Sequence, residues 1–178
     1  MSELRDNYGK ISNTTGWFIL SGTVDGQQGS DNDAAVNGSI TPVDFFISPP
    51  ADTTYEIFAV SLEISDSGAP ALSDYGSVVG PLANGTLVFA VMGGVEVPLS
   101  APVKENRDLI TLGPNSSRFE YTASVTVTTY EFNLLETATS GILIQGNKGD
   151  SIGFRIADDL SSLINHSITI KGISYVQA

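Results

Sequence analysis

Few residues of this chain carry catalytic chemistry. His166 is the single histidine among 178 residues, and cysteine is absent. A Ser-His-Asp triad or a histidine metal site would depend on this one imidazole, and the lack of thiols excludes disulfides, thiolate metal sites and cysteine catalysis. We interpret His166 as a polar residue of the turn before the last strand, hydrogen-bonded to backbone or water.

The acidic loop Asp25–Asp33 is the best candidate for a metal site. It holds three carboxylates together with Asn32, and Ca²⁺ prefers oxygen ligands of this kind. The loop lacks the alternating acidic order, the glycine and the closing glutamate of a known calcium loop. A solvated acidic loop is therefore favoured, no metal ligand or cofactor is assigned, and Ca²⁺ binding by Asp25–Asp33 is left open.

Asp158 and Asp159 together suggest an acid–base pair of the glycosidase type, but their spacing argues against it. Adjacent residues of a strand or turn point apart, and such carboxylates need a gap of roughly 5–9.5 Å. Asp158 is more simply the N-cap of the turn that follows it, accepting backbone N–H groups. Nucleophile elbows, zinc-binding helices, phosphate loops and dinucleotide fingerprints are absent too, so we predict no catalytic residue and no enzyme.

The apolar block of Trp17, Phe18, Ile19 and Leu20 is the candidate partner-binding segment. Such a block is usually buried in the core of its own domain. If it belongs to an N-terminal arm, it can instead lie against a neighbouring subunit, where a buried Trp is a natural anchor.

Composition excludes several classes of protein. With 41% hydrophobic and 16% charged residues, the chain should fold rather than remain disordered. Eight basic residues against 20 acidic ones give a net charge of −12, which repels both nucleic acid and anionic membranes. No apolar run is long enough to span a membrane, and the N-terminus has no apolar signal segment.

Alternation of apolar and polar residues predicts about ten short strands and an all-β fold. Only segments around residues 71–75 and 158–164 look capable of a helical turn, and both are too short for a stable helix. The expected strands are Trp17–Val24, Val43–Ile47, Tyr55–Ser65, Leu87–Met92, Val95–Leu99, Arg107–Leu112, Phe119–Thr128, Thr129–Leu134, Gly141–Gln145, Ser151–Ile156 and Ser167–Val176.

Glycines refine this prediction. Gly93 and Gly94 can adopt the positive φ angles of a two-residue hairpin turn. The apolar phase of the last strand changes near Gly172, which predicts a β-bulge there. We expect an antiparallel, jelly-roll-like β-sandwich over residues 38–178, with an N-terminal arm and polar loop over residues 1–37; an immunoglobulin-like sandwich is the alternative.

Several runs in the C-terminal half resemble small virion structural proteins of tailed bacteriophages. The runs are PVKENRDL (102–109), ILIQGNKGDSIGFRIADDLSSL (142–163) and IKGISY (170–175), with DYGS (74–77) and LANGTL (82–87) upstream. Residues before about position 50 take no part. The resemblance implies a β-sandwich subunit attached to the capsid or the tail of a virion, without enzymatic activity.

Two functions follow from this resemblance. The first is a capsid decoration, or cement, protein that binds the major capsid protein on the shell surface as a homo-oligomer, with a trimer favoured. The second is a tail or head-fibre module for host or glycan recognition, with tyrosines such as Tyr75, Tyr121 or Tyr130 as stacking platforms. Neither function involves nucleic acid, a membrane or a cofactor.

Overall fold

The computed structural model describes residues 11–21, 35–66, 71–111, 118–122, 125–133 and 141–177. Within these ranges the chain forms ten strands, one short α-helix, α1 (Asn106–Thr111), and one 3-10 turn, η1 (Gly146–Lys148). The strands are β1 (Ile11–Ser21), β2 (Val43–Ile47), β3 (Thr53–Asp66), β4 (Thr86–Met92), β5 (Val95–Pro98), β6 (Arg118–Thr122), β7 (Val125–Asn133), β8 (Ile142–Gln145), β9 (Ser151–Ile156) and β10 (Asn165–Gln177).

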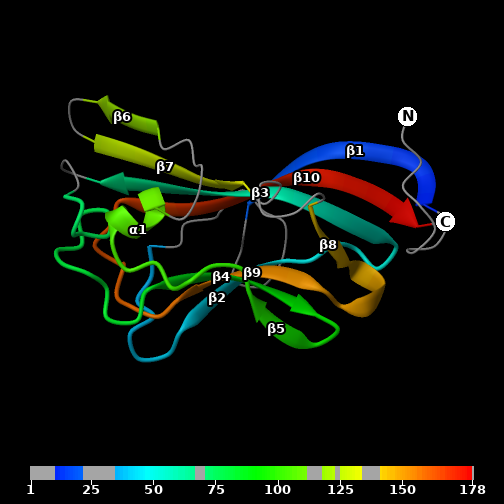
Figure 1. The fold of residues 1–178 in the computed structure, drawn as a ribbon, viewed down its shortest axis with the longest axis horizontal. Coiled ribbons are helices and arrows are strands. Elements are labelled where there is room, and N and C mark those ends of the chain that lie inside the picture. The colour runs from blue at the N-terminus through cyan, green and yellow to red at the C-terminus, as the bar shows by residue number, and fades with distance from the viewer. Residues whose placement is uncertain are drawn as a thin grey trace.

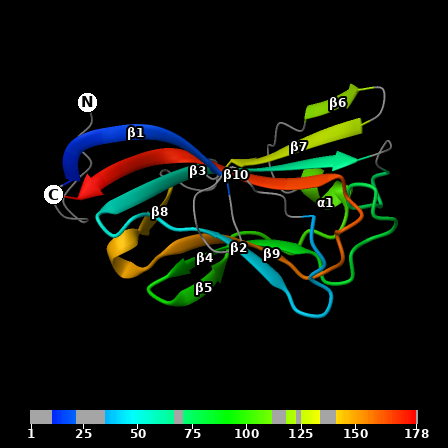
Figure 2. The same ribbon diagram turned by 180° about the vertical axis from the view of Figure 1, so that it is seen from behind.

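The strands form two antiparallel sheets stacked as two layers (Figures 1 and 2). The larger sheet has the order β1-β10-β3-β7-β6, with β8 also paired to β3, and the smaller sheet has the order β2-β9-β4-β5. The predicted all-β, antiparallel architecture is therefore confirmed. The jelly-roll path of the chain stays a prediction.

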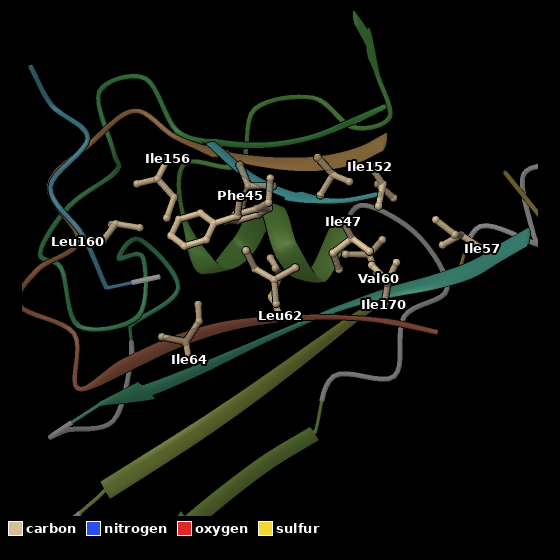
Figure 3. Close-up of a cluster of buried hydrophobic side chains, with 14 of the residues drawn as sticks. Phe45, Ile47, Ile57, Val60, Leu62, Ile64, Ile152, Ile156, Leu160 and Ile170 are labelled. Atoms are coloured by element: carbon tan, nitrogen blue, oxygen red, sulfur yellow. The ribbon is translucent and has the colours of Figure 1, made fainter. Parts of the chain in front are cut away.

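The core lies between the two sheets. Figure 3 shows the side chains of β2 and β9 pointing toward those of β3 and β10. In these four strands alternate residues point inward, apart from the step from Ile57 to Val60 in β3, and this is the geometry that period-two patterning produces. Burying each of these large apolar side chains contributes roughly 1.5–3 kcal/mol. Those that are at most 3% exposed include Phe45, Ile47, Ile57, Val60, Leu62, Ile64, Ile152, Phe154, Ile156 and Ile170.

Strand β3 is the central element of the larger sheet. One of its edges pairs with β10 along nearly its whole length, from Thr53 to Ser65. The other edge is shared, because β8 pairs with residues 54–57 and β7 with residues 59–66. Because β3 is 14 residues long, it can pair with three other strands in this way.

The hairpin turn predicted from glycines is confirmed, and the predicted bulge lies in β3 instead of β10. Strands β4 and β5 are joined by Gly93 and Gly94, whose φ angles are 57° and 79°. The pairing of β10 with β3 shifts by one residue between Lys171 and Gly172, so a bulge lies opposite the predicted place. The extra residue is Phe58 of β3, however, and not a residue of the last strand.

Two predicted strands are wrong, and Thr129–Leu134 is not a separate strand, because its described residues continue β7 (Val125–Asn133). Residues 107–111 belong to helix α1, where the Asp108 carboxylate accepts the backbone N–H groups of Lys104 and Glu105 and so stabilises the helical turn. The run Phe119–Thr128 is not one strand but parts of β6 and β7, which pair antiparallel around a reversal between Thr122 and Val125. Alternation has the same period before and after a reversal, so it does not mark the turn.

The N-terminal segment contains an edge strand of the larger sheet. Residues 11–21 form β1, which pairs with β10 from Gln177 to Thr169. Trp17 is opposite Ile173, and Leu20 is opposite Ile170. The division into residues 1–37 and 38–178 stays a prediction.

The contact between Gly153 on β9 and Phe89 on β4 gives a test of side-chain packing on the smaller sheet. A Cβ on Gly153 would lie 2.4 Å from the ring carbon Cζ of Phe89, a fully buried side chain. We expect Gly153→Ala to lower the free energy of unfolding by about 1–3 kcal/mol, measured by urea titration. Val95→Ala on the exposed strand β5 is the control and should change stability by less than about 0.5 kcal/mol. Equal effects in the two variants would contradict this account.

Candidate functional site

His166 is a core residue in this structure. It is fully buried, and its Nε2 lies 2.9 Å from the Tyr75 hydroxyl, which also receives a 3.3 Å hydrogen bond from Thr86 Oγ1. The imidazole makes edge contacts with the rings of Tyr75 and Phe154. The interpretation of His166 as a hydrogen-bonded polar residue agrees with this setting, although its partner is a buried tyrosine rather than backbone or water.

Tyr75 therefore cannot act as a surface platform for a sugar ring, because it is also fully buried. This corrects the expectation that Tyr75 is exposed. The side chains of Tyr121 and Tyr130 lie outside the described part of the structure, although their backbones belong to β6 and β7.

A second buried pair joins β3 to β10. The Tyr175 hydroxyl donates a 2.5 Å hydrogen bond to Glu56 Oε2, and the backbone N–H of Gly141 donates to Glu56 Oε1. Burial, reinforced by the hydrogen bond to the Glu56 carboxylate, raises the pKa of Tyr175 above its ordinary value. Glu56 is thus held by two donors, which explains how a carboxylate is accommodated at 7% exposure.

Asp158 ties together loops at one end of the sandwich. Its carboxylate accepts three consecutive backbone N–H groups, from Ala83, Asn84 and Gly85, at 2.7–3.3 Å. Its own backbone carbonyl accepts the N–H of Gly38 at 2.8 Å. One residue therefore links three segments that are far apart in the sequence.

The predicted N-cap role belongs to Asp159 rather than to Asp158. Asp159 Oδ1 accepts the backbone N–H and the hydroxyl of Ser161, and its Oδ2 accepts the Asn37 side-chain amide. The hydrogen bonds from Ser161 lower the pKa of Asp159 below its ordinary value. The buried Asp158 carboxylate therefore accepts hydrogen bonds from a turn that is distant in the sequence, whereas the exposed Asp159 carboxylate caps the turn that follows it.

The loops tied by Asp158 lie at one end of the molecule, on the left in Figure 1 and on the right in Figure 2. We call residues 35–42, 71–85 and 157–164 together the loop end. Four of the six large hydrophobic side chains that are exposed among the described residues belong to it: Ile40, Leu72, Val79 and Ile164. No sequence pattern singled out these four residues, although Val79 is followed by Gly80 and Ile40 lies two residues from both Gly38 and Pro42.

The outer face of the smaller sheet is held by a charged cluster. Arg155 on β9 donates paired hydrogen bonds to Asp44 on β2 and to Glu96 on β5, at 2.8–3.0 Å. The hydrogen bonds donated to Asp44, and then those to Glu96, raise the pKa of Arg155 above its ordinary value. The guanidinium also covers the Phe89 ring, 4.8 Å from its centroid.

The space between the sheets includes a small apolar void. Its volume is about 10 Å³, about the size of one water molecule, and side chains of β2, β3, β4, β9 and β10 line it. A substrate cannot enter a void of this size. Among the described residues, no group of three or more histidine, cysteine or acidic side chains is placed to hold a metal ion.

The two predicted binding segments lie largely outside the described part of the structure. The acidic loop Asp25–Asp33 lies outside the described residues. Trp17, Phe18, Ile19 and Leu20 are described as backbone of β1, and the assignment of their side chains to a partner stays a prediction. Within the described ranges, no helix has the length and hydropathy of a membrane span.

Comparisons with protein-family models, curated protein sequences and solved structures find no match for this chain.

The role of Asp158 can be tested by removing its carboxylate. Asp158→Ala leaves the N–H groups of Ala83, Asn84 and Gly85 without their acceptor, so we expect a loss of about 2–3 kcal/mol in the free energy of unfolding. Asp158→Asn retains an acceptor oxygen and should lose less. Urea titration measures both, with Asp159→Ala as the neighbouring control that should have the smallest effect. Asp158→Ala as stable as wild type would contradict the assignment.

The buried Glu56–Tyr175 pair gives a pH-dependent prediction. Tyr175→Phe removes a donor to Glu56 and should cost about 1–3 kcal/mol at neutral pH. In the wild type, the unfolded chain loses the Tyr175 proton near pH 10 while the folded chain retains it, so stability falls as pH rises above about 10. Urea titrations at neutral pH and above about pH 10 should show a smaller fall for Tyr175→Phe. Identical pH dependence in both proteins would contradict a raised pKa.

Proposed function

We propose that this chain is a virion structural protein of a tailed bacteriophage, a decoration protein that binds the major capsid protein and stabilises the shell as an oligomer, with a trimer favoured. Attachment to the tail is the alternative location within the virion. The proposal concerns adhesion, and no catalytic step is part of it.

The convergence of the runs that resemble phage structural proteins is the observation that carries the proposal. Asn106, in the run 102–109, donates its backbone N–H to the Asp74 carbonyl, and its side chain bonds to both backbone groups of Gly76. Asp158, in the run 142–163, binds the turn within the run 82–87. Runs far apart in the sequence therefore form one hydrogen-bonded unit, as parts of a shared domain should.

The use of the chemically capable side chains supports adhesion rather than catalysis. His166 is paired with Tyr75, Glu56 with Tyr175, and Asp158 with backbone N–H groups. Each of these groups stabilises the fold. Exposed apolar side chains at the loop end, in contrast, are available for contact with another protein.

Interface burial is sufficient for this function. A subunit interface of about 1,600 Å², at about 25 cal/mol per Å² of apolar area, supplies tens of kcal/mol before the costs of association. The net charge of −12 keeps the rest of the surface soluble when many copies are concentrated on one particle.

The copy number of the protein in purified phage particles tests the proposal. We expect gel densitometry against the major shell protein to give a ratio near one copy per few shell subunits. Particles should also lose heat or osmotic stability when the protein is absent. A copy number in single digits, with saturable binding on a glycan array, would instead favour the tail or head-fibre recognition module. Absence from purified particles would overturn both.

A further inference from the structure

We propose that the loop end, residues 35–42, 71–85 and 157–164, is the surface that docks on the partner, and that the partner presents an apolar site rimmed by Lys or Arg. This inference rests on the proposed function and extends it, because it names the docking surface and the chemistry of the surface that receives it.

Exposure of apolar side chains is the first observation. Ile40 is 94% exposed and Val79 is 89% exposed, and Leu72 and Ile164 are each more than half exposed. Solitary exposed hydrophobics are common, but four of them on neighbouring loops at one end of a molecule are typical of an interaction surface. The remaining exposed large hydrophobics in the described chain, Val95 and Val97, lie on the edge strand β5.

The loops that carry these side chains are held in place. Gly38 and Asn37, beside Ile40, are hydrogen-bonded to Asp158 and Asp159. The N–H of Gly80, next to Val79, donates to the Asp74 carboxylate.

The other two side chains are held as well. The carbonyl of Leu72 accepts the N–H of Arg107, and the N–H of Ile164 donates to the carbonyl of Ser65. A surface with its backbone already fixed loses little entropy when it binds, so these hydrogen bonds favour docking.

Charge identifies the kind of partner. The loop end contains no Lys or Arg. Of its three acidic residues, Asp158 is buried against backbone N–H groups, so Asp74, which is partly exposed, and Asp159, which is exposed, supply the charge of the surface. The adjoining segment 103–108 adds Lys104, whose ammonium group donates to the Ala83 carbonyl of the loop end, and Arg107, but also Glu105 and Asp108, so its charges balance. The surface is therefore apolar and acidic, and basic side chains around an apolar site complement it.

A second copy of this chain fits the loop end less well. Two copies meeting through this surface would bring the carboxylates of Asp74 and Asp159 in one copy toward those of the other, and each copy carries a net charge of −12. The edge strand β5 offers no better route, because Glu96 and Pro98 on an exposed edge oppose the addition of another strand. A different protein with a basic rim is thus the favoured occupant.

Rebinding to particles that lack the protein tests the inference. The probe is phage particles prepared without this chain, to which purified wild-type protein or variants are added, and bound protein is quantified after sedimentation. The test variant is Ile40→Ser with Val79→Ser, two residues so exposed that folding should be unaffected. The matched control is Val95→Ser with Val97→Ser, on strand β5. Urea titration of each variant verifies that it is folded.

We expect the loop-end variant to bind about ten-fold or more weakly and the control to bind within about two-fold of wild type. Raising the salt concentration should weaken wild-type binding, since it screens the attraction between carboxylates and basic groups. Equal binding of the two variants, or binding that is unaffected by salt, would overturn the inference while leaving the proposed function intact.

Two further outcomes separate the remaining explanations. Wild-type protein that fails to bind the particles at all would overturn the proposed function and this inference together. Analytical ultracentrifugation of the protein alone tests whether a second copy of this chain binds the loop end. A wild-type oligomer that becomes monomeric only in the loop-end variant would show that the surface joins copies of this chain, and would overturn the assignment to a basic partner.

Discussion

The structure depends on burying the inward side chains of β3 and β10 against those of β2 and β9 (Figure 3). Polar groups carried into this space need partners, because an unpaired buried group costs about 1–3 kcal/mol. The pairing of His166 with Tyr75 meets that need next to the core, and the pairing of Glu56 with Tyr175 does so within the larger sheet, between β3 and β10. These chemically capable side chains therefore stabilise the fold.

The two ends of the sandwich differ in how they are built. At one end β1 and β10 run side by side, with Ile11 opposite Gln177. At the other end the loops are joined by the Asp158 carboxylate, which replaces the regular pairing that strands provide. A buried carboxylate that accepts three backbone hydrogen bonds fixes the geometry of a loop much as strand pairing does. Each N–H group must point at the carboxylate to form its hydrogen bond, which restricts the backbone conformation. Exposed apolar side chains on such loops form a surface of defined shape.

Local patterns predicted the parts of the fold that local forces determine. Strands β2 and β9 were predicted with their observed bounds, and Gly93 and Gly94 form the expected turn. The errors arose where alternation does not carry the information. A reversal between Thr122 and Val125 leaves the period unchanged, and helix α1 is stabilised by contacts of Asp108 that composition does not reveal.

The sequence by itself determined the all-β class, the acidic surface and the absence of thiol chemistry, since alternation, charge and composition are properties of the chain alone. Only the tertiary structure decided which carboxylate holds which turn, which tyrosine is buried and which apolar residues remain exposed. Asp158 and the turn at Ala83 are 75 positions apart, and burial depends on what the rest of the fold brings to each residue. A local sequence pattern does not specify which distant residues will contact a given side chain in the folded protein.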